Sequence, residues 1–229
     1  LLCLPPDLDL SLEIDPMFKE IVEANRRTSL IVDAFEEVTC MVERAERMFD
    51  AACTALMSNE ERDVDISAED RAINEGERMI RRLVTQHLTI NPTQDLPASL
   101  ALFSIVHDVE RIGDYAKSLS ELCQWQSDSE GSDAGRQLHE KIAPLFGQLL
   151  QALRDEDVDA ARQVMRTHEE VKIASDTFVT GSFQDEASNR HTVVQVMAVR
   201  FLRRISAHLS NVASSVVNPL DRIGGKEQE

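Results

Sequence analysis

The chain has 229 residues and a formal net charge of −17 at pH 7. This length suggests one large domain or two small ones, enough for a real hydrophobic core. The negative charge argues against direct binding to nucleic acid or to an anionic membrane face, because both need clusters of Lys and Arg. With 42% hydrophobic residues, one Trp, one Tyr and only 8 Gly and 7 Pro, the composition is typical of a folded helical protein.

The first residues, LLCLPPDLDLSLEIDP, form an apolar and acidic stretch that contains three prolines. The stretch lacks the basic n-region and the long apolar h-region of a signal peptide. We therefore expect residues 1–16 to be a connector and the chain to be cut from a longer protein. No run of about 18 apolar residues occurs in the sequence, so no membrane-spanning helix is predicted.

Apolar residues recur at helical spacing in six segments, and no segment alternates strictly enough to predict a strand. A proline-containing break, NPTQDLP, separates the second segment from the third, and the polar run QSDSEGSDAG separates the third from the fourth. The fold class predicted from this pattern is all-α. The helices are expected at about residues 17–57, 68–88, 98–125, 136–153, 157–180 and 188–217.

An internal repeat relates the two halves of the chain. When the pair Arg111–Ile112 is set on the pair Arg204–Ile205, HDVERIGDYAKSL lies over the later helix at a constant shift. The pattern predicts two tandem three-helix bundles. The expected division is a connector (1–16), a first repeat (17–125), a linker (126–135), a second repeat (136–217) and a tail (218–229).

Two pairs of polar residues stand four positions apart beside the expected packing faces. On the third helix, Glu110 and Asp114 lie away from the apolar seam, on the outer face. On the second helix, Asp70 and Asn74 lie on a face that flanks its seam. The third-helix seam itself consists of Leu102, Ile105, Val109, Ile112, Ala116, Leu119 and Cys123.

Glu110 and Asp114 repel each other mildly, and Gly113 beside them costs a helix about 1 kcal/mol relative to Ala. A cation held by both carboxylates, with Asp70 and the Asn74 amide oxygen from the adjacent helix, would offset these costs. An all-oxygen set of this kind suits hard ions such as Mg²⁺, Mn²⁺, Ca²⁺ or ferric iron. The glycine would let a neighbouring helix or a hydrated ion approach the backbone.

The alternative is that Glu110 pairs with Arg111 or Lys117 on a solvated face, and spacing alone does not decide between the two. Enzymatic sites have little support in the sequence. No histidine follows a glutamate by three residues, as a di-iron oxidase would need, and neither a phosphate-cradling glycine-rich loop nor a G-x-S-x-G motif occurs. We expect a protein that is not an enzyme.

The segments VERIGDYAKSL and DRAINEGERMIRRLV resemble the PhoU family of phosphate-uptake regulators, and the resemblance covers about residues 30 to 217. It implies two three-helix repeats, whose second and third helices carry E/D-x-x-x-D motifs that hold metal ions on the bundle surface. Glu110 and Asp114 match the third-helix motif. Asp70 and Asn74 match the second-helix motif, with Asn in place of the final Asp. The implied cofactor is a divalent or ferric ion (Mg, Mn, Fe, Zn or Ca), in the first repeat only.

The second repeat departs from the family pattern. Arg203 and Ala207 stand where the third-helix motif would have its Glu and Asp, and His168 and Lys172 match the second-helix positions more loosely. Charged Arg and Lys side chains do not coordinate a cation. We therefore expect the second metal site to be lost and its basic residues to attract an anion or a carboxylate.

The resemblance implies a non-enzymatic, cytoplasmic regulator of phosphate uptake, partnered by a phosphate ABC transporter and its sensor kinase. The segment from Ser29 to Met57 also resembles the helix that opens the cytoplasmic PhoU-like region of bacterial sodium/phosphate symporters. The chain would then be a regulatory domain attached to a symporter membrane domain, at the inner face of the plasma membrane. A third hypothesis is a metal-free helical scaffold for protein contacts. No nucleic-acid partner is expected, and a homodimer remains open.

Overall fold

The structure, a computed structural model, describes residues 16–58, 63–125, 133–185, 189–218 and 220–224. These residues form α-helices and two short 3-10 helices, and none of them lies in a β-strand, which confirms the all-α prediction. In chain order the elements are α1 (Pro16–Ser58), α2 (Ile66–Ile90), α3 (Leu96–Leu122), η1 (Cys123–Trp125), α4 (Asp133–Asp155), α5 (Val158–Gln184), α6 (Arg190–Val217) and η2 (Leu220–Arg222).

Side-chain caps fix where three of the helices begin. Asp65 and Asp157 accept hydrogen bonds from backbone N–H groups in the first turns of α2 and α5. These N–H groups have no partner within the helix, so an acidic cap satisfies them. Asn189 and Thr192 form a reciprocal capping box at the start of α6. The helix starts therefore follow from local sequence.

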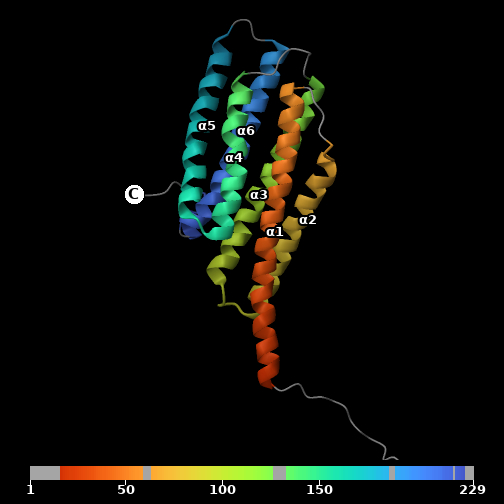
Figure 1. Cartoon of the computed structure of the whole chain (residues 1–229), viewed down its shortest axis with the longest axis vertical. Helices are drawn as coiled ribbons and strands as arrows, with labels where there is room; N and C mark the ends of the chain where they lie inside the picture. Colours follow the sequence, from red (N-terminus) through yellow and green to blue (C-terminus); the bar gives the residue numbers. More distant parts are fainter. Residues whose placement is uncertain (1–15, 59–62, 126–132, 186–188, 219, 225–229) are drawn as a thin grey trace, which may run out of the picture.

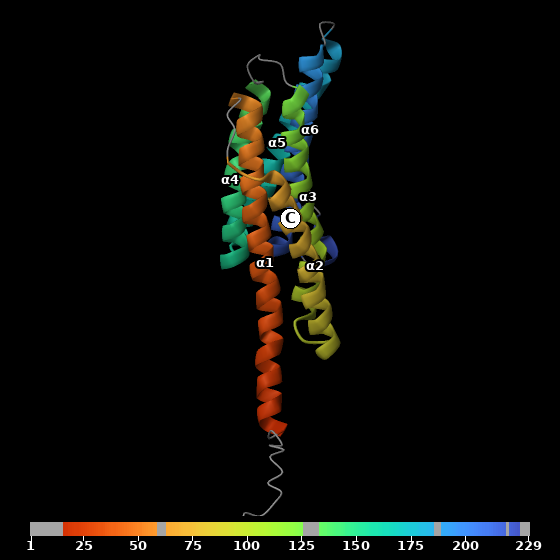
Figure 2. The ribbon, with the colours of Figure 1, turned by 90° about the vertical axis from the view of Figure 1, so that its right-hand side faces the viewer.

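The helices run roughly along the long axis of an elongated bundle (Figure 1). Within the first half, α1 packs against α2 and α3; within the second half, α6 packs against α4 and α5. Contacts of α3 with α6 and of α1 with α4 join the halves. The N-terminal part of α1 extends beyond the other helices (Figure 2). One hydrophobic cluster contains residues of all six α-helices, so the halves share a core.

The predicted packing face of α3 is confirmed. Six of its seven seam residues are buried, and Cys123 is partly buried at the end of the helix. On α2, Ile73, Ile80 and His87 are buried, whereas Ile66 and Leu83 are only partly covered. Removing this apolar surface from water is the main stabilising contribution to such a bundle. The seams therefore position the polar residues between and beside them.

Several predicted boundaries fall on residues that the structure does not describe. The expected connector lies outside the described residues, except for Pro16, which begins α1. Parts of the expected linker and tail also lie outside the described residues, namely residues 126–132, 219 and 225–229. Residues 133–135, expected in the linker, form the first turn of α4. The division into two repeats stays a prediction. Across the described segments, no helix has an apolar run long enough to cross a membrane.

Candidate functional site

Gly113 lies where α2 and α3 approach each other closely. A Cβ atom at this position would lie 2.9 Å from Cδ1 of the buried Ile73, closer than ordinary contact allows. The two helices form an antiparallel hairpin, and this approach sets its register. Asp70 lies opposite Lys117, and Glu77 lies opposite His107. The glycine therefore permits a close helix approach, which is one of the two roles expected from the sequence.

Glu110 is covered by its neighbours. Its side chain is only 13% exposed, and Oε2 lies 3.6 Å from both His107 Nδ1 and Arg111 Nε. No described residue donates a hydrogen bond to this buried oxygen. Burial, followed by the charges of Asp114 and Glu77, raises the pKa of Glu110, and Arg111 and His107 oppose the rise. The position was expected on an outer face, but the α2–α3 packing shields it.

The other three predicted ligands have partners within the protein. Asp114 Oδ2 accepts a hydrogen bond from Arg111 Nη1 at 2.9 Å. Asp70, whose side chain is 12% exposed, accepts one from Lys117 Nζ at 2.8 Å. This hydrogen bond, together with the Asp70 charge, raises the pKa of Lys117. The Asn74 amide nitrogen donates to the backbone carbonyl of Asp70 at 2.9 Å. Basic side chains therefore neutralise two of the carboxylates.

The acidic residues of the first repeat follow one surface of α2 and α3. Within the described ranges, no three side chains of the His, Cys, Asp or Glu type are grouped so that they could hold a metal ion. Glu77 belongs to this surface although the sequence did not single it out: its Oε1 accepts a hydrogen bond from Arg81 at 2.9 Å and lies 3.5 Å from His107 Nδ1. Its place opposite α3 depends on the hairpin register, which no local motif reveals.

In the second repeat, the four positions that depart from the family pattern lie around one pocket of about 220 Å³ between α5 and α6. The pocket is lined by His168, Lys172, Arg200, Arg203, Arg204 and Ala207. Two of its cations have acidic partners: Arg203 donates to Asp176, and Lys172 Nζ lies 3.4 Å from Glu169 Oε2. This wall is basic where the first repeat is acidic.

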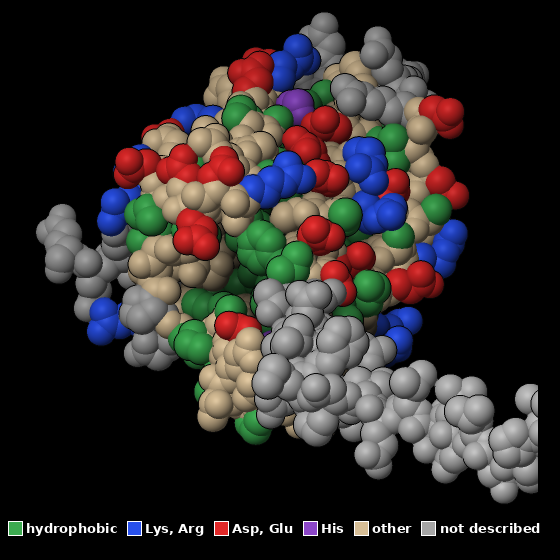
Figure 3. Space-filling view, turned by 60° about the horizontal axis from the view of Figure 1, so that its bottom comes forward, with side chains coloured by type: hydrophobic (Ala, Val, Ile, Leu, Met, Phe, Trp, Pro, Cys, Tyr) green, Lys and Arg blue, Asp and Glu red, His purple; other side chains and the backbone are tan. Residues whose placement is uncertain are grey.

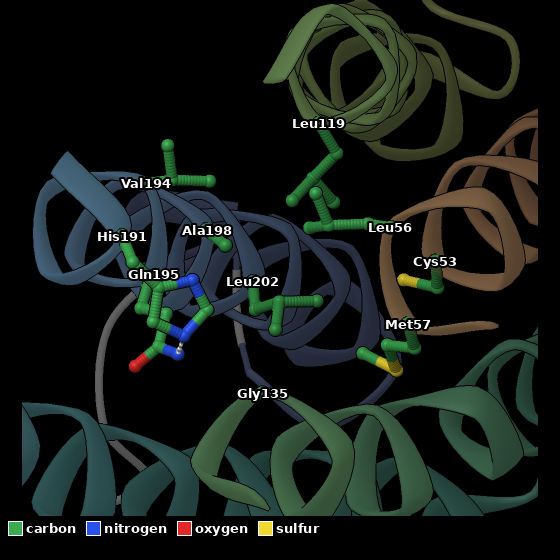
Figure 4. Close-up of a pocket in the computed structure, with 10 residues that line it drawn as sticks. All are labelled: Cys53, Leu56, Met57, Leu119, Gly135, His191, Val194, Gln195, Ala198 and Leu202. Atoms are coloured by element: carbon green, nitrogen blue, oxygen red, sulfur yellow. Dashed lines mark hydrogen bonds between the residues drawn. The ribbon is translucent and has the colours of Figure 1, made fainter. Parts of the chain in front are cut away.

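Two other cavities carry less chemistry. The one drawn in Figure 4 has a volume of about 30 Å³ and is lined mainly by apolar side chains of α1, α3 and α6, with His191 and Gln195 hydrogen-bonded to each other. The other, about 370 Å³, lies between α1, α3, α4 and α6. On the end of the molecule seen in Figure 3, apolar side chains line a hollow among acidic and basic ones. Neither cavity gathers the groups that a catalytic site requires.

A polar contact joins the two repeats. Asp108 Oδ1 on α3 lies 2.7 Å from His208 Nδ1 and accepts a hydrogen bond from Asn211 Nδ2 at 2.9 Å, both on α6. The His208 ring also stacks on Tyr115, with 5.6 Å between the ring centroids. No sequence motif pairs these positions, which are about 100 residues apart, because the contact depends on how the repeats dock.

Two sequence comparisons find similarity between this chain and PhoU proteins. A family model described as the PhoU domain matches residues 38–123. The phosphate-specific transport system accessory protein PhoU homolog of Pseudomonas putida is 25% identical over 186 residues, covering 75% of this chain and 72% of that protein. The chain is similar to the PhoU family in its first half. The range matched by the family model contains Asp70, Asn74, Glu110 and Asp114, and the predicted resemblance to PhoU proteins is confirmed.

Two solved structures share the fold of this chain. PhoU from Pseudomonas aeruginosa superposes with a TM-score of 0.71 at 24% identity, covering 83% of this chain and 96% of that one. The phosphate transport system regulatory protein PhoU from Streptococcus pneumoniae gives 0.64 at 16% identity, with 86% and 94% covered. The fold is therefore that of PhoU. These relatives are named as accessory or regulatory proteins, in agreement with the expected non-enzymatic class.

Proposed function

We propose that this PhoU-like chain regulates phosphate uptake through contacts with phosphate transport machinery on the cytoplasmic side of the membrane. The observation that carries the proposal is the PhoU-domain match over residues 38–123, within a fold that follows a PhoU structure over 83% of the chain. The proposed partners are a phosphate transporter and the sensor kinase that works with it.

The test is to delete the coding segment in the organism that encodes it and to measure uptake of radiolabelled phosphate at fixed external phosphate. A change in uptake that the reintroduced segment reverses supports the proposal. Unchanged uptake contradicts it. The full reading frame distinguishes a free-standing regulator from a domain of a symporter. A membrane domain in the same reading frame would mean that the chain regulates the transporter to which it is attached.

The finer part of the proposal is one hard cation at the first repeat, held by Glu110 and Asp114 with Asp70 and Asn74 from α2. Glu110 Oε2 supports it, because this buried oxygen accepts no hydrogen bond from the described residues and a cation would stabilise a carboxylate whose ionised form is disfavoured by burial and by the charges of Asp114 and Glu77. The residues fit only in part. Lys117 competes for Asp70, and Arg111 competes for Asp114. Glu77 is a further oxygen donor beside Glu110.

This competition gives the cation proposal a sharp test. Lys117→Ala should strengthen Mn²⁺ binding, measured by calorimetry, because it frees the Asp70 carboxylate. Lys141→Ala is the matched control, since Lys141 is 43% exposed and pairs with Glu170, whereas Lys117 is 41% exposed. Asp114→Ala should weaken binding. If the Mn²⁺ affinity is the same in the wild-type protein, in Lys117→Ala and in Asp114→Ala, the metal-free scaffold is the better description.

A further inference from the structure

The basic pocket between α5 and α6 holds positive charge that the described residues do not fully neutralise. Arg200 and Arg204 both line the pocket and are exposed. Neither forms an ion pair or a hydrogen bond with any residue that the structure describes. The chain carries 41 acidic side chains against 24 Lys and Arg, so acidic partners are abundant. Two cations at one pocket with no partner among the described residues are therefore unexpected.

The arrangement concentrates like charge. Arg200 and Arg204 stand four residues apart on α6, a spacing that brings side chains together on one helix face and makes like charges repel. Arg203 and Lys172 add to the positive charge of the same wall, although each has one acidic neighbour. An anion bound between these side chains would relieve the repulsion.

The positive charge of the pocket also acts on His168, which lies in its wall. Its Nδ1 lies 2.8 Å from the buried Ser206 Oγ, so the ring is held at the pocket wall. Burial lowers the pKa of His168, the charge of Glu169 opposes this, and the charges of Lys172 and Arg203 lower it further. The positive charge of the pocket lining comes from three arginines and one lysine: Arg200, Arg203, Arg204 and Lys172.

We propose that this pocket binds a small tetrahedral oxyanion, namely inorganic phosphate, through the guanidinium groups of Arg200 and Arg204. Guanidinium groups present planar, forked donors that match phosphate oxygens and stay charged at all physiological pH values. A volume of about 220 Å³ leaves room for such an anion and some of its water. Arg203 and Ala207 occupy the repeat positions of Glu110 and Asp114, so the second repeat would bind an anion where the first presents carboxylates. The inference goes beyond the proposed function, because it concerns binding by the purified chain alone.

Calorimetric titration of the full chain with inorganic phosphate tests the proposal, with sulfate and a glutamate-rich peptide as comparison ligands. The test variant is Arg200→Ala/Arg204→Ala. The matched control is Arg78→Ala/Arg82→Ala, which removes the same charge at the same spacing from exposed positions on α2. Phosphate affinity should fall roughly tenfold or more in the test variant, because two charge-assisted contacts are lost, and should stay close to wild type in the control. Circular dichroism confirms that both variants are folded.

A second measurement on the wild-type protein does not depend on any substitution. Phenylglyoxal modifies accessible guanidinium groups, and mass spectrometry of the digested protein locates each modified arginine. Phosphate should protect Arg200 and Arg204 and leave Arg78 and Arg82 reactive. The proposal is overturned if phosphate binding is undetectable, if test and control variants lose affinity equally, or if only the peptide binds. Protection confined to the pocket arginines supports it.

Discussion

Replacing Gly113 with alanine tests how tightly α2 and α3 pack at the predicted cation site. In a helix interior, alanine is favoured over glycine by about 1 kcal/mol. The added Cβ, however, would lie 2.9 Å from Cδ1 of Ile73, a side chain that is 1% exposed and has little room to move. Overpacking of this kind costs about 1–3 kcal/mol. We therefore expect Gly113→Ala to lower the free energy of unfolding by about 0–2 kcal/mol.

The sign should reverse when the clashing atom is removed. Ile73→Val deletes Cδ1, and the next Ile73 atom, Cγ2, lies 3.6 Å from the built Cβ, an ordinary contact distance. Ile73→Val alone should cost about 0.5–1.5 kcal/mol. In that background Gly113→Ala should raise stability by up to about 1 kcal/mol, so the cycle of four proteins should show a coupling of about 1–3 kcal/mol.

Urea unfolding of the four proteins, followed by circular dichroism with the m-value checked for constancy, measures the cycle. Gly147→Ala is the control, because a Cβ at Gly147 in α4 has no neighbour within 4 Å. It should stabilise both backgrounds equally. If Gly113→Ala stabilises the wild-type protein as much as Gly147→Ala does, the close approach of α2 is not the reason for the glycine.

Three further substitutions test single contacts. Asp108→Ala should lower the free energy of unfolding in urea by about 1–3 kcal/mol, because the His208 ring loses its acceptor between the repeats. Glu110→Gln should raise the melting temperature at neutral pH with chelator present, because burial raises the pKa of Glu110 and its ionised form opposes folding. That gain should vanish in acid, below the ordinary Glu pKa, where folded and unfolded states are both protonated; a gain that persists there contradicts the reasoning. Because burial lowers the pKa of His168, stability should fall as the pH drops from about 7 to 5, and His168→Gln should reduce that fall in thermal melts.

The helices and their inner faces were predictable because they depend on local sequence. Leu102 and Ile105 repeat at helical spacing and are buried, and Asp65 and Asp157 stand where helices need an acceptor for their first N–H groups. Gly113 also carried a readable signal, since a glycine inside a strong helix needs a packing reason. The caps and the seams depend only on residues a few positions away, whereas for Gly113 the sequence indicates a close contact but not its partner.

The partners of the site residues were not predictable in the same way. The sequence left open whether Glu110 holds a cation or pairs with Arg111 or Lys117. In the structure, Arg111 Nε lies 3.6 Å from Glu110 Oε2, and Lys117 pairs with Asp70 on the neighbouring helix. That choice depends on the register of the α2–α3 hairpin, which places Glu77 beside Glu110 as well. Spacing along one helix does not contain this information.

The difference between the two predicted repeats follows from where the proposed ligand positions and their counterparts on α6 lie. On α6, Leu202 and Ile205 are fully buried, as the corresponding seam of α3 is, and α3 and α6 pack against each other across the shared core. A polar residue at a seam position would bury an unsatisfied group and cost the whole bundle stability. Arg203 and Arg204 instead stand at the edge of a solvated pocket, where a charge of either sign is tolerated at little cost. The same fold therefore supports an acidic surface in one half and a basic pocket in the other. The charged positions lie outside the buried seams, so their charge can differ without changing the packing of the helices.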